Sequence, residues 1–468
     1  MINRQEFEQA QYRCAQHYLM DLKTYAELYE SKNQAQLAVR QLKNDWHQIE
    51  HCLDWATNSG TERAAELCLA FCDAGGLLIT DLQDFPRRLA WYTTGLRAAQ
   101  RLERTSLVAR QLFRLGTIHR DLAKYDVAQG YIEQSLALAR ESEIQDLVAD
   151  CYNELGIIAK RLGQHREAWD WAQQALDVAR TLANNIRVAN CLRSLSTIAY
   201  EMGNVENAIE LARESYAIFE AIGAPRDIAH LAYMIGSMLL SDETQLEDAR
   251  RFLWRAYEMY KQIGIKRLAA SAACNIASDL MENLNDYERA IQLAEDALVT
   301  YRSLDYPLGI CNALTILGEV ALKQGNLQRA RDWFAEGLAL AYDTRSAWDI
   351  INLLLGLGKV ANQARQFEEA QQHLVEALKV AVDGHMTGLA LLALIHLAIP
   401  LAQHTGQTER AVELIGLARS HPVTSSDVAR EAESILAQLD LDLPQQAIDQ
   451  ALERGAHLDF DSVTSEYT

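Results

Sequence analysis

The chain has 468 residues, a formal net charge of −20, 49% hydrophobic and 23% charged residues, and 6 prolines. This balance is typical of a folded, helix-rich protein and excludes extensive disorder. A strongly negative field repels phosphate backbones, so we expect no direct binding of nucleic acid. The longest apolar stretch, residues 388–402, is shorter than a membrane span, so we expect no membrane segment.

Four segments follow one another along the chain. Residues 1–60 are rich in polar side chains and end in an apolar stripe at Trp55, which predicts an N-terminal helical cap. Residues 61–105 are expected to form an irregular first repeat, and residues 106–420 a regular helical array. Residues 421–468 are expected to form a C-terminal helical cap and a frayed acidic tail.

The regular segment is marked by alanines that recur at intervals of 40 or 41 residues. They are Ala128, Ala168, Ala208, Ala249, Ala290, Ala330, Ala370 and Ala411. A second small residue precedes each alanine by 12 or 13 residues. These residues are Gly116, Gly156, Ser196, Gly236, Ala277, Gly318, Gly358 and Ala398. Such a period indicates a solenoid, because each unit buries its apolar face only by stacking on its neighbours.

One unit, residues 147–179, shows how each repeat is built. Apolar residues recur at three- and four-residue steps up to Ala159, Gly163 interrupts the pattern, and a second stripe of the same spacing runs to Ala179. This pattern predicts two amphipathic helices joined by a turn at Gly163. The small residues are expected where the two helices cross, since they let the helix axes approach to the short end of the usual interaxial distance of ~8 to 10 Å.

These residues resemble the tetratricopeptide repeat, whose pattern runs Leu-Gly, Tyr, Ala, a large apolar residue and Ala. The matching positions are Leu115-Gly116, Leu155-Gly156, Leu317-Gly318 and Leu357-Gly358, with Ala128 and Tyr131, and with Ala330 and Phe334. The period exceeds the usual ~34 residues and implies longer helices. The resemblance implies an all-α, helix-turn-helix solenoid in a right-handed superhelix, with about 8–9 repeats, helical caps and one elongated array.

Both ends of the chain resemble bacterial STAND-type ATPase regulators. Residues 45–56 look like the segment that opens the repeat region of those proteins, although Gln48 stands where the family has Asn. Residues 411–418 and 447–455 look like their closing segments. The sequence contains no phosphate-binding loop of the GxxxxGK[ST] type. The resemblance therefore implies a sensor region, with a separate ATPase or effector protein as a candidate partner.

Two short motifs bear on catalysis and metal binding. His47, Glu50 and His51 match the inverted zinc-protease motif, but they lie in the cap segment and no third ligand is specified, so a solvated helix face is the better interpretation. Cys68 and Cys72 lie one helical turn apart, and two isolated thiols make a poor metal site. We expect a non-enzymatic protein with no catalytic residue, no metal and no cofactor.

The location of the protein is constrained by two features. The 8 cysteines are dispersed without the paired spacing of a disulfide framework. The N-terminal residues lack the apolar core of a secretion signal. Both features favour a reducing, cytoplasmic location.

A candidate groove emerges when each first helix is aligned on its small residue. Positions two, three and six residues before the small residue, and one and four after it, are expected to face the concave side of the array. The polar and aromatic residues on these positions are Arg114, Arg120, Asn153, Lys160, Asn190, Arg193, Tyr200, Tyr233, Asn275, Asn312 and Asn352. Asparagine can bracket the amides of an extended peptide, and Arg and Lys can hold a carboxylate. A solvated inner face without a ligand is the alternative.

Two functions remain open at this point. The first is a protein- or peptide-binding module that senses a ligand or partner in signal transduction, as chaperone-binding repeats and peptide-pheromone receptors suggest by resemblance. The second is a static scaffold that assembles a multiprotein complex. A repeat array contacts its neighbours only, so small rotations add along it and could carry a signal.

Overall fold

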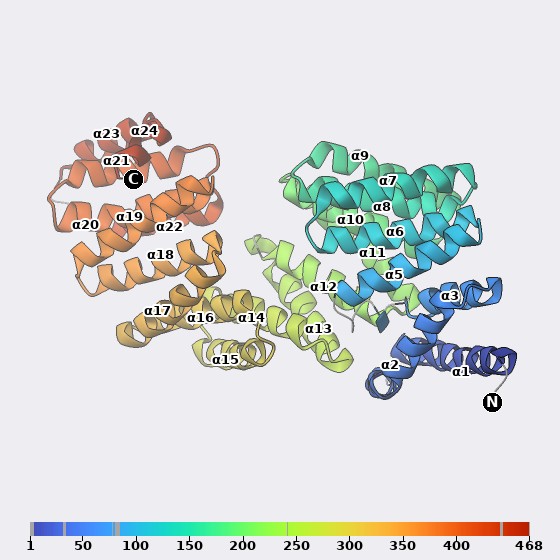
Figure 1. The fold of residues 1–468 in the computed structure, drawn as a ribbon. Helices are drawn as coiled ribbons and strands as arrows, with labels where there is room; N and C mark the ends of the chain where they lie inside the picture. The colour runs from blue at the N-terminus through green and yellow to red at the C-terminus, as the bar shows by residue number, and fades with distance from the viewer. Residues whose placement is uncertain are drawn as a thin grey trace. The chain divides into compact units, whose positions relative to one another are not determined.

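The computed structural model describes residues 4–30, 34–76, 78–79, 85–240, 242–439 and 443–467. Within these ranges the regular structure consists of α-helices and one short 3-10 helix, with no strand (Figure 1). The expectation of an all-α fold is confirmed. The chain divides into two compact units, Met1–Met259 and Tyr260–Thr468. The boundary falls inside residues 106–420, where the sequence predicts one regular array.

The first unit is built from paired helices that follow one another along the chain. The helices are α1 (Arg4–Glu30), α2 (Ala35–Asn58), α3 (Glu62–Ala74), α5 (Phe85–Arg101), α6 (Thr105–Asp121), α7 (Tyr125–Glu141), α8 (Gln145–Arg161), α9 (His165–Thr181), α10 (Asn185–Glu201), α11 (Val205–Ile222), α12 (Pro225–Leu239), η1 (Glu243–Gln245) and α13 (Leu246–Ile263), whose last turn crosses the boundary. From α6 to α12 each helix contacts the next, and α8 also contacts α6 and α10. The first helices of successive repeats therefore lie side by side.

The second unit repeats this arrangement and ends in shorter helices. The helices are α14 (Lys266–Glu282), α15 (Tyr287–Ser303), α16 (Pro307–Lys323), α17 (Leu327–Thr344), α18 (Ala347–Gln363), α19 (Phe367–Asp383), α20 (Thr387–Gln403), α21 (Thr408–Ser420), α22 (Ser426–Gln438), α23 (Gln445–Ala456) and α24 (Phe460–Ser465). Contacts link α14 to α16, α16 to α18, α18 to α20 and α20 to α22. The alternate helices again form one layer.

The small residues lie where the paired helices cross, as the sequence predicts. A Cβ atom on Gly156 would lie 3.1 Å from the Ala168 carbonyl oxygen. The equivalent atom on Gly236 would lie 3.0 Å from the Ala249 carbonyl oxygen. All eight alanines of the periodic set have no exposed surface. The backbones of the two helices in each pair approach more closely than a larger side chain would allow. This close approach explains why small residues, mostly glycine and alanine, recur at these positions.

The turns between paired helices use the left-handed backbone region. Gly163 has φ 75°, and Gly203 has φ 80° at the same place in the next repeat. Glycine adopts this conformation without steric cost, because it has no Cβ atom. Ala123 occupies the equivalent turn with φ 55°, so the turn also forms where the sequence supplies no glycine.

The C-terminal tail is ordered, so the expectation of a frayed tail is wrong. The tail forms α24, in which the side chains of Val463 and Thr464 are buried. Next to it, Glu466 accepts a hydrogen bond of 2.5 Å from the Arg410 guanidinium of α21. Burial of Val463 and this charged contact hold the tail on the last repeats, although its composition is acidic.

Candidate functional site

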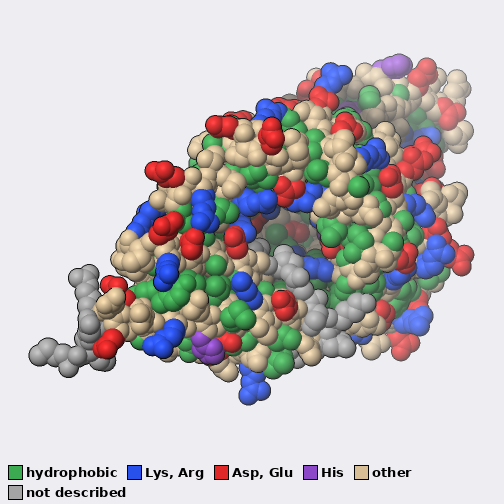
Figure 2. All heavy atoms as spheres, turned by 90° about the vertical axis from the view of Figure 1, so that its right-hand side faces the viewer, with side chains coloured by type: hydrophobic (Ala, Val, Ile, Leu, Met, Phe, Trp, Pro, Cys, Tyr) green, Lys and Arg blue, Asp and Glu red, His purple; other side chains and the backbone are tan. Residues whose placement is uncertain are grey.

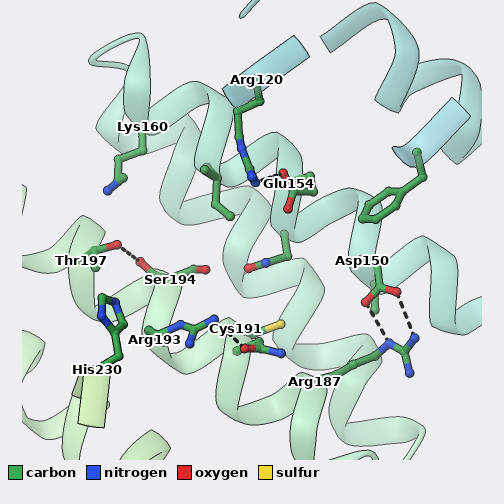
Figure 3. Close-up of a pocket in the computed structure, with 15 residues that line it drawn as sticks. Arg120, Asp150, Glu154, Lys160, Arg187, Cys191, Arg193, Ser194, Thr197 and His230 are labelled. Carbon is green, nitrogen blue, oxygen red and sulfur yellow. Dashed lines mark hydrogen bonds and ion pairs between the residues drawn. The ribbon is translucent and has the colours of Figure 1, made fainter. Parts of the chain in front are cut away.

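A cavity of about 530 Å³ lies within the first unit, bordered by α6, α8, α10 and α12. Its walls are formed by Phe113, Arg120, Ala149, Asp150, Asn153, Glu154, Ile157, Lys160, Arg187, Asn190, Cys191, Arg193, Ser194, Thr197 and His230. These residues come from the first helices of four consecutive repeats (Figure 3). The cavity is therefore a property of the stacked array and not of any one repeat.

The position of each side chain follows from the repeat period. Asn153 and Arg193 both lie three residues before the small residue of their repeat, and Asn190 and His230 both lie six before it. Helices of equal phase present the same positions on the same face, so these side chains converge where α8, α10 and α12 lie side by side.

One wall of the cavity carries a buried carboxylate. The Arg120 guanidinium donates a short hydrogen bond to Glu154, whose side chain is almost fully buried. Burial raises the pKa of Glu154, and the positive charge of Arg120 opposes that rise. Arg120 also donates to Asp121 at 2.7 Å, and Asp121 in turn accepts from Arg88 of α5 at 3.3 Å. A chain of charges thus connects this wall to the preceding helices.

A second set of ion pairs closes another wall. Arg187 of α10 donates two hydrogen bonds of 2.9 Å to the two carboxylate oxygens of Asp150 on α8 (Figure 3). Such a fork-like contact fixes the orientation of both side chains. Lys160 lies 3.1 Å from the carboxylate of Glu201 and has a side chain that is 12% exposed.

Arg193 connects α10 with α12. It donates one hydrogen bond of 2.7 Å to Asp227 and another of 2.7 Å to the Oδ1 atom of Asn190. His230 lies in the same wall, and burial, followed by the charge of Arg193, lowers the pKa of His230 to about 4. The imidazole is therefore neutral at pH 7 and adds no positive charge to the walls.

One polar atom of the walls has no hydrogen-bond partner among the described residues. The Oδ1 atom of Asn153 is buried and unpaired. A buried acceptor without a donor costs free energy, of the order of 1–3 kcal/mol. A water molecule or a ligand N–H group in the cavity would satisfy this atom once the amide turns towards it.

The structure brings together five of the eleven residues that the sequence singled out. They are Arg120, Asn153, Lys160, Asn190 and Arg193. Arg114 lies elsewhere, where it donates a hydrogen bond of 2.6 Å to Asp73 of α3. Tyr200 is 45% exposed near the end of α10, and neither it nor Tyr233 of α12 lines the cavity.

The three remaining asparagines belong to the second unit. Asn275, Asn312 and Asn352 lie on α14, α16 and α18. Asn352 donates a hydrogen bond of 2.8 Å to the Trp348 carbonyl of its own helix. They therefore take no part in the cavity of the first unit.

Two acidic residues and one histidine of the site are missing from the sequence prediction. Asp150, Glu154 and His230 occupy the predicted groove positions, but the prediction considers only amides, cations and tyrosines there. Their spacing from the small residue of each repeat would have been enough to identify all three. Arg187 lies nine residues before its small residue and thus outside the predicted positions, so only the contact with Asp150 reveals it.

Charged side chains of both signs are interspersed over the face shown in Figure 2, around a hollow that opens there. In the described part of the chain, no group of three or more His, Cys, Asp and Glu side chains could hold a metal ion. The two histidines of the zinc-protease-like motif, His47 and His51, are exposed on α2. None of the described helices combines the length and apolar character needed to cross a membrane.

Comparison with known proteins identifies the repeats. Residues 105–181 and 147–221 match the tetratricopeptide repeat family model. No match is found among curated proteins. The apo form of RapI has 18% sequence identity and a TM-score of 0.50, and the match covers 62% of this chain and 98% of RapI.

A second solved structure is similar over more of the chain. It is the Signal Transduction ATPase with Numerous Domains (STAND) protein with a tetratricopeptide repeat sensor from Pyrococcus horikoshii. The two share 12% identity with a TM-score of 0.54, over 88% of this chain and 55% of that one. At these identities the likeness concerns the fold. The family match identifies tetratricopeptide repeats in residues 105–221, within α6 to α11, and the solved structures show that the chain shares the fold of tetratricopeptide-repeat proteins.

Proposed function

We propose that the chain is a non-enzymatic regulator that senses a protein segment or peptide bound in the cavity of the first unit. The observation that carries this proposal is the buried, unpaired Oδ1 atom of Asn153 in a cavity built by four consecutive repeats. A ligand that donates a hydrogen bond satisfies this atom. Extended peptide backbones present such N–H donors at regular intervals.

The cations of the walls can hold a ligand that also carries a carboxylate. Arg120, Lys160, Arg187 and Arg193 contribute four positive charges, and they are paired with the carboxylates of Glu154, Glu201, Asp150 and Asp227, respectively. The chain as a whole carries −20, and an anionic group of a ligand would exchange with one of these carboxylates. A peptide with an acidic side chain or a free C-terminus offers both the N–H donor and the anion.

Sensing is supported by the position of the cavity. Arg193 joins α10 to α12, Arg187 joins α10 to α8, and Arg120 joins α8 to α6. A ligand that changes these contacts biases the angles between repeats. The Pyrococcus horikoshii protein is described as carrying a tetratricopeptide repeat sensor, which agrees with this role. A separate ATPase or effector is the partner that would receive the signal.

The binding site is tested with a peptide selected from a random library displayed on phage. Asn153→Ala should weaken binding by about 1 kcal/mol, roughly a fivefold rise in Kd, because one hydrogen bond is lost. Asn352→Ala is the matched control, since its side chain bonds to its own helix. Fluorescence anisotropy measures both. Equal affinity of the wild type and Asn153→Ala would exclude the cavity as the binding site.

The static scaffold is the second candidate, and small-angle scattering separates the two. A sensor should change its radius of gyration when the selected peptide saturates it. An unchanged radius at saturation would favour the scaffold.

A cytoplasmic location is part of the proposal and is supported by the eight free cysteines.

A further inference from the structure

Two thiols meet at the interface of the first two helices. Cys14 lies on α1 and Cys52 on α2, and their Sγ atoms are 3.8 Å apart. Cys14 is partly exposed, whereas the other seven cysteines are buried. The one cysteine of intermediate exposure therefore lies in contact with a second cysteine.

The contact belongs to a fixed helix pair. The two helices are packed against each other along the chain's first hairpin (Figure 1). On the same pair, the Tyr25 hydroxyl of α1 donates a hydrogen bond of 2.6 Å to the Asp45 carboxylate of α2. Both contacts join α1 to α2, and Ala15 and Ile49, close to the two cysteines in sequence, are buried in the same hydrophobic cluster as Cys52. Packing thus holds the thiols together, and bond formation needs a small approach of the two sulfur atoms.

We propose that Cys14 and Cys52 form an oxidant-sensitive disulfide site that joins α1 to α2. With hydrogen peroxide as oxidant, the Cys14 thiolate attacks one peroxide oxygen, the O–O bond breaks and Cys14 becomes a sulfenic acid; the leaving hydroxide takes the proton that the thiol released and becomes water. The Cys52 sulfur then attacks the Cys14 sulfur, its proton passes to the departing hydroxide, and a second water is released. Two thiols are oxidised and one peroxide is reduced to two waters.

The order of these steps follows from exposure. Cys14 meets the oxidant first because it is the partly exposed thiol. Burial, followed by the proximity of Cys14, raises the pKa of Cys52 to about 12, so Cys52 stays protonated and acts as the second thiol. Cys68 and Cys72, one turn apart on α3, have at most 1% exposed surface and serve as an internal comparison.

Mass spectrometry of the folded, full-length chain tests the proposal. After treatment with hydrogen peroxide and blocking of free thiols, a non-reducing tryptic digest should contain one linked peptide pair carrying Cys14 and Cys52. Six of the 8 thiols should remain free in the denatured protein, and dithiothreitol should restore the other two. Cys68→Ser should leave this pattern unchanged in the remaining thiols.

Cys14→Ser and Cys52→Ser should each abolish the link, and circular dichroism checks that both variants fold. The wild-type digest decides the question even if a variant is unstable. Oxidation of Cys14 to a sulfinic acid without a linked peptide would overturn the proposal. Links that involve Cys68 or Cys72, or eight free thiols after treatment, would overturn it as well.

Discussion

The helix crossing of the repeats can be tested by adding one methyl group at two different glycines. Gly156 of α8 lies at a crossing, where a new Cβ would be 3.1 Å from the Ala168 carbonyl oxygen and 3.3 Å from the Ala172 backbone nitrogen. Gly130 of α7 is also inside a helix, but a Cβ there would have no neighbour within 4 Å. The two positions therefore differ in packing and share the same intrinsic preference.

The expected sign differs between the two variants. Replacing a glycine inside a helix by alanine stabilises the helix by about 1 kcal/mol, so Gly130→Ala should gain that amount. Gly156→Ala gains the same amount but must displace backbone atoms, and overpacking costs typically 1–3 kcal/mol. We expect a net loss of about 1 kcal/mol at Gly156, and thus a difference of about 2 kcal/mol between the variants.

Urea denaturation followed by circular dichroism at 222 nm measures both free energies of unfolding. Gly130→Ala reports the intrinsic gain, and its difference from Gly156→Ala isolates the crossing. If Gly156→Ala is as stabilising as Gly130→Ala, the backbones of α8 and α9 do not approach as closely as described, and the reading of the 40-residue period as a packing signal fails.

Further predictions concern a second helix crossing and the half-buried imidazole of His230. Ala208→Leu should destabilise the chain by about 1–3 kcal/mol, because Ala208 has no exposed surface and accepts a hydrogen bond from Ser196; Ala217→Leu, at an exposed position of the same helix, should be nearly neutral in the same urea titration. As pH falls from 6.5 towards 4, the unfolded chain takes up a proton at His230 before the folded chain does, since its folded pKa is about 4. Stability should drop by about 2–3 kcal/mol over that window, and His230→Gln should remove this part of the slope while the exposed His385→Gln keeps it.

The sequence predicts the repeat architecture well because the packing requirement recurs. Every helix pair needs a small residue at its crossing, so Gly156, Ser196 and Gly236 report the same constraint at each period. Ser196 shows how far the rule extends, since its hydroxyl bonds to the Ala208 carbonyl at 2.7 Å and so turns the close approach into a contact. A packing requirement that recurs in every repeat can therefore be recognised in a single sequence.

The site is predicted only in part because its contacts do not recur. Arg114 and Arg193 both occupy groove positions. Arg114 donates a hydrogen bond to Asp73 on α3 and does not line the cavity, whereas Arg193 donates one to Asp227 on α12 and does line it. The partner of each of these two cations is more than 30 residues distant, on the N-terminal side for Arg114 and on the C-terminal side for Arg193. Position on a helix face follows from the period, whereas the direction of a long charged side chain depends on these individual partners.

The pairing of the cations also bears on how the proposed ligand would act. Arg193, Lys160 and Arg120 each already hold a carboxylate, so an incoming anion gains by exchange and not by neutralising a free charge. Exchange of one carboxylate for another contributes little net affinity in a partly solvated site. It does release the displaced partner, and Asp227, Glu201 and Glu154 lie on three different helices. Affinity should therefore come mainly from the hydrogen bond to Asn153, while the charged groups convert occupancy into altered contacts between repeats. For this reason the neutral asparagine is the better probe of binding, and the arginine pairs are the better probe of signalling.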